Sequence, residues 1–193
     1  MPNQNNTCQQ DARVVVELLE EERILYLNGE ITSDVSFFFN KALLRLEHQN
    51  SSADITLYIN CPGGSVPDGL AMIDTMNLVS CDIATVCVGF AASMGAMILM
   101  SGQKGKRRIL PHSEVLIHQP LGHGGNTYRQ ASDIEINTRN ILRTRDTLYR
   151  LISQATGQPF ERVQKDCDRD YILTAQEALE YGIVDEILSS HRI

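Results

Sequence analysis

The chain has 193 residues, of which 42% are apolar and 21% charged, and its 17 Lys and Arg against 24 Asp and Glu leave a formal charge of −7. This apolar content excludes a disordered chain, and the acidic balance argues against nucleic-acid binding, because phosphate contacts need a concentrated positive face. We expect a single domain over residues 1–193, long enough to bury a sizeable core.

Strands and helices are predicted to alternate over the first two thirds of the chain. Runs of β-branched and aliphatic residues predict strands at residues 24–27, 55–59, 83–88 and 115–118. Helical spacing predicts one helix capped by Ser33 or Asp34 and ending at His48, and another that opens at Pro67 or Asp68 and ends at Leu78. This alternation indicates an α/β fold with mainly parallel strands.

Residues 83–100 contain no charge and have the length at which a membrane helix is considered. Their first part is β-branched and their second part is rich in small residues, which favours a buried strand ended by Gly89 and a buried helix after it. We therefore do not expect a membrane span. The basic cluster at 104–108 that follows is expected to form a solvated loop.

The last third of the chain is dominated by one long helical pattern. Residues 126–156 lack proline and glycine, with apolar residues at helical spacing, and Gly157 and Pro159 stop the pattern. Either two helices meet near Ser132, or one arm packs on another subunit; the second is favoured. Shorter helices are predicted at 159–165 and 174–181, and a final strand at 183–188.

The five cysteines are odd in number and lack metal-ligand spacing. Neither a disulfide framework nor a zinc site is indicated, and the polar N-terminus lacks the layout of a signal peptide, so we expect a cytoplasmic protein. The cysteines are Cys8, Cys61, Cys81, Cys87 and Cys167.

Three places carry residues suited to chemistry. Gly63 and Gly64 follow a predicted strand, where paired glycines let backbone N–H groups approach a ligand, although this signal is weak. Ser93 lies between a strand and a helix, but its Ala-x-Ser-x-Gly context misses the nucleophile-elbow pattern by one residue, and an N-cap serine is the commoner explanation. His118 ends another strand, and site residues gather at such strand ends.

A serine and a histidine that each end a separate strand are a plausible nucleophile and base. Spacing does not choose the acid that would orient the histidine. Asp166, Asp168 and Asp170 lie in one stretch and remain alternatives.

Several sequence blocks resemble the proteolytic subunit of the Clp protease. They are, in order, NCPGGSV at 60–66, AASMGA at 91–96, IHQP at 117–120, DIEI at 133–136, DRD at 168–170 and the stretch 177–185. The resemblance covers roughly residues 23–190 and implies a crotonase-like α/β fold of repeated β-β-α units. It further implies a long projecting handle helix within about residues 120–156 and a divergent N-terminal axial segment at 1–20.

The resemblance implies a serine endopeptidase that hydrolyses peptide bonds of unfolded proteins in a self-compartmentalised protease. Matching the blocks assigns Ser93 as nucleophile, His118 as base and Asp170 as acid, with the backbone N–H groups of Gly64 and Met94 as oxyanion donors. The resemblance implies no metal and no cofactor in this chain, since ATP is used by a partner unfoldase.

The resemblance also implies an assembly of two stacked heptameric rings, a tetradecamer, that is served by a hexameric AAA+ unfoldase. Asp168 and Arg169 match the inter-ring salt-bridge pair. Neither nucleic acid nor membrane is expected as a partner. The cleft that docks the unfoldase is expected to include Thr56, Tyr58, Leu78, Val86, Arg108, Leu110 and Leu188.

Some positions depart from the family pattern. Cys61 stands where a small hydroxyl residue is usual, and the segment between His118 and Asp133 is about three residues longer. The departures leave two alternatives: a weakly active or scaffolding paralogue that works only in a mixed ring with a second isoform, and, ranked last, a crotonase-like acyl-CoA enzyme.

Overall fold

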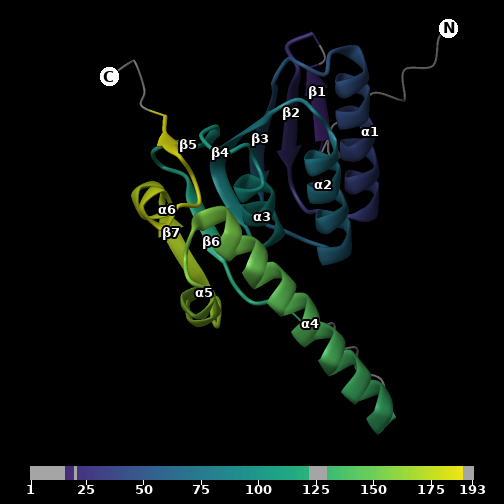
Figure 1. Cartoon of the computed structure of the whole chain (residues 1–193), viewed down its shortest axis with the longest axis vertical. Helices are drawn as coiled ribbons and strands as arrows, with labels where there is room; N and C mark the ends of the chain where they lie inside the picture. Colours follow the sequence, from purple (N-terminus) through teal and green to yellow (C-terminus); the bar gives the residue numbers. More distant parts are fainter. Residues whose placement is uncertain (1–15, 20, 122–129, 189–193) are drawn as a thin grey trace, which may run out of the picture.

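The computed structural model describes residues 16–19, 21–121 and 130–188. Within these residues eight strands form one mixed sheet, and six helices pack around it (Figure 1). The strands are β1 (Val16–Leu19), β2 (Ile24–Asn28), β3 (Ile55–Cys61), β4 (Ile83–Ala92), β5 (Arg107–Ile109), β6 (Glu114–Ile117), β7 (Tyr171–Thr174) and β8 (Glu186–Ile187).

The helices are α1 (Ser33–Gln49), α2 (Val66–Leu78), α3 (Met94–Met100), α4 (Ala131–Thr156), α5 (Phe160–Asp166) and α6 (Ala175–Tyr181). The N-cap of α1 is Thr32, not the predicted Ser33 or Asp34, because its hydroxyl accepts the Val35 N–H at 3.4 Å. The second predicted helix begins at Val66, just before the predicted Pro67.

The main sheet has the order β1-β2-β3-β4-β5-β8, parallel throughout except for the antiparallel edge strand β1. In β3, Ile55, Leu57 and Ile59 are fully buried while the residues between them are half-buried, as expected for a strand with one face on the core. The predicted α/β class with mainly parallel strands is confirmed.

Strand β4 changes its pairing partner near Gly89. Its first part pairs with β5 and its last residues pair with β6, while the Gly89 N–H donates to Ser113 Oγ at 2.7 Å. The prediction that Gly89 ends this strand is therefore wrong, because β6 supplies a new pairing partner that carries the strand on to Ala92. None of the described helices has both the length and the apolar content to cross a membrane.

The basic cluster at 104–108 does not form a solvated loop throughout. Lys104 and Gly105 are exposed, but Arg107 opens β5 and is 3% exposed. Its guanidinium donates to both carboxylate oxygens of Asp185, at 2.9 and 2.6 Å, and to the Ala155 C=O at 2.9 Å. The prediction is wrong here because the partner that makes burial possible lies 78 residues further along the chain.

Helix α4 runs unbroken over 26 residues, about 39 Å at 1.5 Å per residue, and projects from the body of the molecule (Figure 1). Its C-terminal part buries Leu148, Tyr149 and Ile152, whereas Ile134 and Ile136 near its beginning are each 54% exposed. The projecting helix is confirmed, with no break near Ser132; residues 126–129 of the predicted helix lie outside the described residues.

The remaining differences concern short elements. The four-residue strands β1 and β7 were not predicted, and β8 is shorter than the predicted strand at 183–188. Helix α6 begins with a capping box in which Thr174 and Glu177 bind each other's backbone N–H groups. The antiparallel pairing of β6 with β7 matters most, because it brings two site residues together.

Candidate active site

Ser93 occupies a sharp turn between β4 and α3. Its backbone angles, φ 53° and ψ −120°, lie in a region that side-chain-bearing residues rarely adopt. The turn is held by the Ser93 N–H, which donates to the Leu116 C=O at 2.9 Å, and by the Ser93 C=O, which accepts from the Met97 N–H at 3.1 Å. This strained strand-to-helix turn presents the hydroxyl as a nucleophile elbow does, even though the strict motif is absent.

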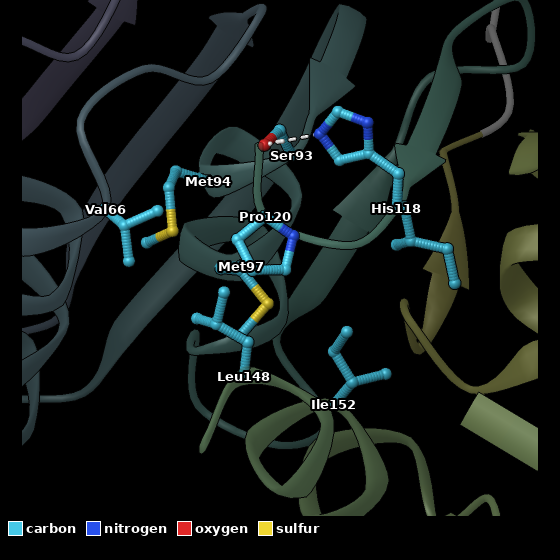
Figure 2. A pocket seen from close by; sticks show the side chains of 9 residues that line it. Val66, Ser93, Met94, Met97, His118, Pro120, Leu148 and Ile152 are labelled. Carbon is cyan, nitrogen blue, oxygen red and sulfur yellow. Dashed lines mark hydrogen bonds between the residues drawn. The ribbon is translucent and has the colours of Figure 1, made fainter. Parts of the chain in front are cut away.

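The Ser93 side chain does not cap its helix. Ser93 occupies the N-cap position of α3 without a capping hydrogen bond from its side chain, and its Oγ lies 2.9 Å from His118 Nε2 (Figure 2). The commoner explanation of a serine at this position, helix capping, does not account for this hydroxyl.

His118 also contacts Asp170, with 2.9 Å between Nδ1 and Oδ1. Strands β6 and β7 are antiparallel, and Ile117, the last residue of β6, pairs with Tyr171, the first residue of β7. The residue after Ile117 is His118 and the residue before Tyr171 is Asp170, so these two face each other. Of the three candidate aspartates, Asp170 is the one in contact with His118. Asp166 accepts a hydrogen bond from Tyr181 at 3.1 Å, and Asp168 pairs with Arg169 at 3.2 Å.

The turn at Gly63 and Gly64 lies beside Ser93. A Cβ at Gly63 would lie 2.7 Å from the Ser93 Cβ, and one at Gly64 would lie 2.3 Å from the Ile31 C=O oxygen. Their φ angles, +102° and +145°, also disfavour any other residue. Glycine is therefore required at Gly63 for the turn to approach Ser93, and at Gly64 for the turn to approach the Ile31 backbone.

Ile31 orients this turn through two backbone hydrogen bonds. Its N–H donates to the Gly63 C=O at 2.8 Å, and its C=O accepts from the Ser65 N–H at 2.9 Å. Because the N–H of a trans peptide points opposite to the preceding C=O, the Gly64 N–H points away from Ile31. The Met94 N–H belongs to the first turn of α3, where amides have no intrahelical acceptor. Sequence reasoning missed Ile31, which no motif marks.

A pocket adjoins Ser93 and His118 (Figure 2). Its other lining residues are all apolar, and Leu148 and Ile152 reach it from α4. In the sequence these two residues are part of the helical spacing of apolar residues, which did not reveal that they border the site. The lining residues are Val66, Ser93, Met94, Met97, Ile117, His118, Pro120, Leu148 and Ile152. Within the described residues, no cluster of His, Cys, Asp or Glu is arranged to hold a metal ion.

Cys61, the last residue of β3, packs beneath the glycine turn. It is fully buried, and its Sγ accepts from the Gly63 N–H at 3.4 Å. Burial raises the pKa of this thiol to about 11, although the hydrogen bond from Gly63 acts in the opposite direction. At pH 8 only about one such thiol in a thousand is ionised, and thiolates are the reactive form.

We expect iodoacetamide at pH 8 to leave Cys61 unmodified and peptidase activity unchanged, because the thiol is both buried and protonated. Peptide mapping by mass spectrometry, with activity measured on the same samples, checks this. Protein treated in urea serves as the control, in which all 5 cysteines should be alkylated. Labelling of Cys61 in the folded protein would contradict the expectation.

The residues expected in a docking cleft are only partly brought together. Tyr58, Val86 and Arg108 are direct neighbours across β3, β4 and β5, and Thr56 lies on the same sheet face. Leu110 and Leu188 flank β5 through hydrogen bonds to Cys87 and Ile109. Leu78, the last residue of α2, is 74% exposed and stands outside this row.

The two residues matched to an inter-ring pair contact each other within the chain. The side chains of Asp168 and Arg169 lie 3.2 Å apart and are 67% and 82% exposed. Both are therefore accessible at the surface of the single chain. The extra residues near 123–128 lie outside the described residues. Of the axial segment expected at 1–20, residues 16–19 form β1 and the others lie outside the described residues.

Comparisons with known proteins show the family to which the chain belongs. The family model for Clp protease matches residues 7–191. The chain is 52% identical over 168 residues to the ATP-dependent Clp protease proteolytic subunit 3 of Synechococcus sp. (strain CC9605), and equally so to proteolytic subunit 2 of Prochlorococcus marinus (strain MIT 9313). Each alignment covers 87% of this chain and 83% of the relative. The chain therefore belongs to the Clp protease family and is a serine peptidase, a hydrolase.

Proposed function

We propose that Ser93 is the nucleophile of this peptidase, His118 its general base and Asp170 the acid that orients the histidine. The observation that supports this most strongly is the continuous contact from Ser93 Oγ through the imidazole to the Asp170 carboxylate, at 2.9 Å on each side. A helix-capping role for Ser93 would not require its hydroxyl to contact His118, nor His118 to contact Asp170. The complete set of contacts also argues against a purely scaffolding paralogue and gives a crotonase-like acyl-CoA enzyme no support.

The proposed reaction is acyl transfer to Ser93. His118 Nε2 removes the hydroxyl proton as Oγ bonds to the peptide carbonyl carbon, and Asp170 holds Nδ1–H so that Nε2 is the free acceptor. The same proton then passes to the leaving amine as the C–N bond breaks. Water repeats the attack on the acyl-enzyme and releases the carboxylic acid product.

The negative charge that develops on the carbonyl oxygen would be stabilised by the N–H groups of Gly64 and Met94. The rigid clamp of Ile31 on the glycine turn supports this role for Gly64. One such donor is typically worth about 10²–10³ in rate. The apolar pocket beside Ser93 would accept an apolar side chain of an unfolded polypeptide, because burying that side chain in the pocket would stabilise the bound substrate.

Membership of the Clp protease family implies a ring-forming oligomer that works with a Clp unfoldase. We infer that two heptameric rings stack through α4, because this helix exposes Ile134, Ile136 and Leu142 to solvent in the single chain. Asp168 and Arg169 would then contact the opposite ring, and a paralogous subunit could share the assembly.

The partner unfoldase is proposed to be a hexameric AAA+ ATPase. Its proposed docking surface is the row on one sheet face formed by Tyr58, Val86 and Arg108, with Thr56 beside it. Leu110 and Leu188, and the separately placed Leu78, complete this surface.

ATP would be used by the unfoldase, so we propose that this chain needs no cofactor. Four buried free cysteines, Cys61, Cys81, Cys87 and Cys167, are consistent with a reducing, cytoplasmic setting.

A fluorophosphonate probe tests the nucleophile directly. We expect the wild-type chain to be labelled at Ser93 alone, with loss of labelling after prior denaturation, because reaction requires the histidine contact. Peptide mapping of the adduct locates the label. Labelling at a different serine, or none in fractions that hydrolyse peptides, would contradict the proposal.

Native mass measurement on the same fractions tests the assembly. Activity confined to a mass of about fourteen chains supports stacked heptamers. Activity that appears only after a paralogue is added would indicate a mixed ring, and a fully active monomer would contradict the assembly.

A further inference from the structure

The loop at residues 167–170 carries Asp170 from the end of α5 to the start of β7. Cys167 at its beginning is fully buried, but the Asp170 side chain is 70% exposed. Packing around Asp170 therefore contributes little to its position. The carboxylate is therefore placed by the contacts that hold the two ends of the loop, one of which is the pairing of Tyr171 with Ile117 in the β6–β7 ladder.

Gln119, the residue after His118, binds this loop at two points. Its backbone N–H donates to the Cys167 C=O at 2.7 Å, and its side-chain amide donates to the Asp168 C=O at 2.8 Å. Both bonds are short for N–H···O=C contacts. They tie the segment that carries the base to the loop that carries the acid.

The Asp168 carbonyl has a second donor, Arg169 Nη1 at 2.7 Å. Arg169 belongs to the loop itself, so this bond shapes the loop without fixing its distance from His118. The β6–β7 ladder holds Tyr171, the residue after Asp170, opposite Ile117, the residue before His118. The two bonds of Gln119 hold the other side of the loop, at Cys167 and Asp168, against the segment that follows His118.

We propose that Gln119 is a positioning residue that holds the acid loop against the end of β6 and so keeps the Asp170 carboxylate at hydrogen-bonding distance from His118 Nδ1. The proposal rests on the roles proposed above for Ser93, His118 and Asp170. Gln119 acts through the loop and does not take part in the bond changes.

Loss of the side-chain bond should affect catalysis more than substrate binding. The backbone bond to Cys167 persists in any variant, and Arg169 still satisfies the Asp168 carbonyl, so the fold should tolerate the change. The loop would lose one of the two bonds that Gln119 makes to it, and Asp170, held then mainly by the β6–β7 ladder on its other side, could move away from the imidazole. A misplacement of about 1 Å can cost about 10²-fold in rate.

The test is Gln119→Leu, which keeps the approximate size of the side chain and removes the donor. We expect kcat for a small fluorogenic peptide to fall about 10- to 100-fold, with KM little changed. The rate of fluorophosphonate labelling should fall in parallel, since both reactions use the same base. Gln176→Leu is the matched control, because Gln176 binds Glu180 on the surface of α6, away from the site.

Melting temperature and native mass are measured for each variant. A Gln119→Leu chain with unchanged mass and melting temperature but reduced kcat supports the proposal. Wild-type kcat in that chain overturns it, as does a loss of kcat that only follows dissociation of the assembly. Ser93→Ala, measured alongside, separates this proposal from the proposed nucleophile. An active Ser93→Ala chain refutes the nucleophile, whereas an inactive Ser93→Ala chain beside a Gln119→Leu chain of normal activity refutes only the positioning role of Gln119.

Discussion

Replacing Ser93 by alanine is expected to lower kcat/KM for a small peptide with leucine at the cleaved bond by about 10⁴-fold or more, because no other group can form the acyl-enzyme. The Oγ of Ser93 is the atom that His118 contacts at 2.9 Å, and the oxyanion donors cannot replace it. Fluorogenic peptide hydrolysis at equal chain concentration measures the loss.

Ser101→Ala is the matched control for this substitution. Ser101 caps the opposite end of the same helix, where its hydroxyl donates to the Met97 C=O at 2.8 Å, away from the proposed chemistry. Its activity should remain close to that of the wild type. Native mass and circular dichroism of both variants verify the fold, and substantial turnover by a folded Ser93→Ala chain would refute the assignment.

Replacing Asp185 by alanine is expected to remove about 3–5 kcal/mol from the free energy of unfolding. The reason is the Arg107 guanidinium, whose side chain is 4% exposed and would lose its carboxylate partner. Asp185 also accepts the backbone N–H groups of Gly105 and Arg107, at 2.7 and 3.0 Å, and the Arg107 guanidinium binds the Ala155 C=O at the end of α4. Urea denaturation at fixed chain concentration measures the change.

The neighbouring pair of Arg108 on β5 and Glu186 on β8 provides the control. Arg108 and Glu186 lie 3.1 Å apart, but their side chains are 36% and 55% exposed, so Glu186→Ala should cost only about 0–1 kcal/mol. Arg107→Met combined with Asp185→Ala should cost less than Asp185→Ala alone, because the unpaired buried charge is then gone. Equal losses in the buried and exposed pairs would show that burial does not govern this contribution.

The same pair predicts a pH dependence. Burial by itself would raise the pKa of Asp185, but the hydrogen bonds and charge of Arg107 hold that pKa below its ordinary value. A lowered pKa in the folded state stabilises the fold above the unfolded pKa of about 3.9 and loses this effect as the pH falls through the folded value. The difference in free energy of unfolding between wild type and Asp185→Asn should therefore narrow on acidification. A difference that widens would contradict a lowered pKa of Asp185 in the folded state.

Local sequence was sufficient where one segment determines its own structure. The apolar alternation of β3, the periodicity that ends in buried Leu148 and Ile152, and the glycine that terminates α4 all act over a few residues. These signals predicted the α/β class and the long helix. They did not reveal β1, β5 and β7, because three or four positions show little alternation, although β6, which is as short, was predicted.

The blocks around Ser93 and His118, and their resemblance to one family, were likewise visible in the sequence and pointed to peptidase chemistry. Local spacing left three aspartates as alternatives and favoured capping for Ser93. The structure places Asp170 against His118 because β6 and β7 pair in an antiparallel register that no local pattern encodes.

Tertiary contacts decided the features whose partners are distant in the chain. Arg107 is buried because Asp185 neutralises it, the glycine turn is oriented by Ile31, and the acid loop is held by Gln119. In each case the sequence supplies the residue type, while the free energy comes from a contact between segments that only the folded chain brings together. The sequence by itself thus determined the class of fold and the chemistry, and the tertiary structure determined which groups meet, because hydrogen bonds and buried charges depend on distance in space.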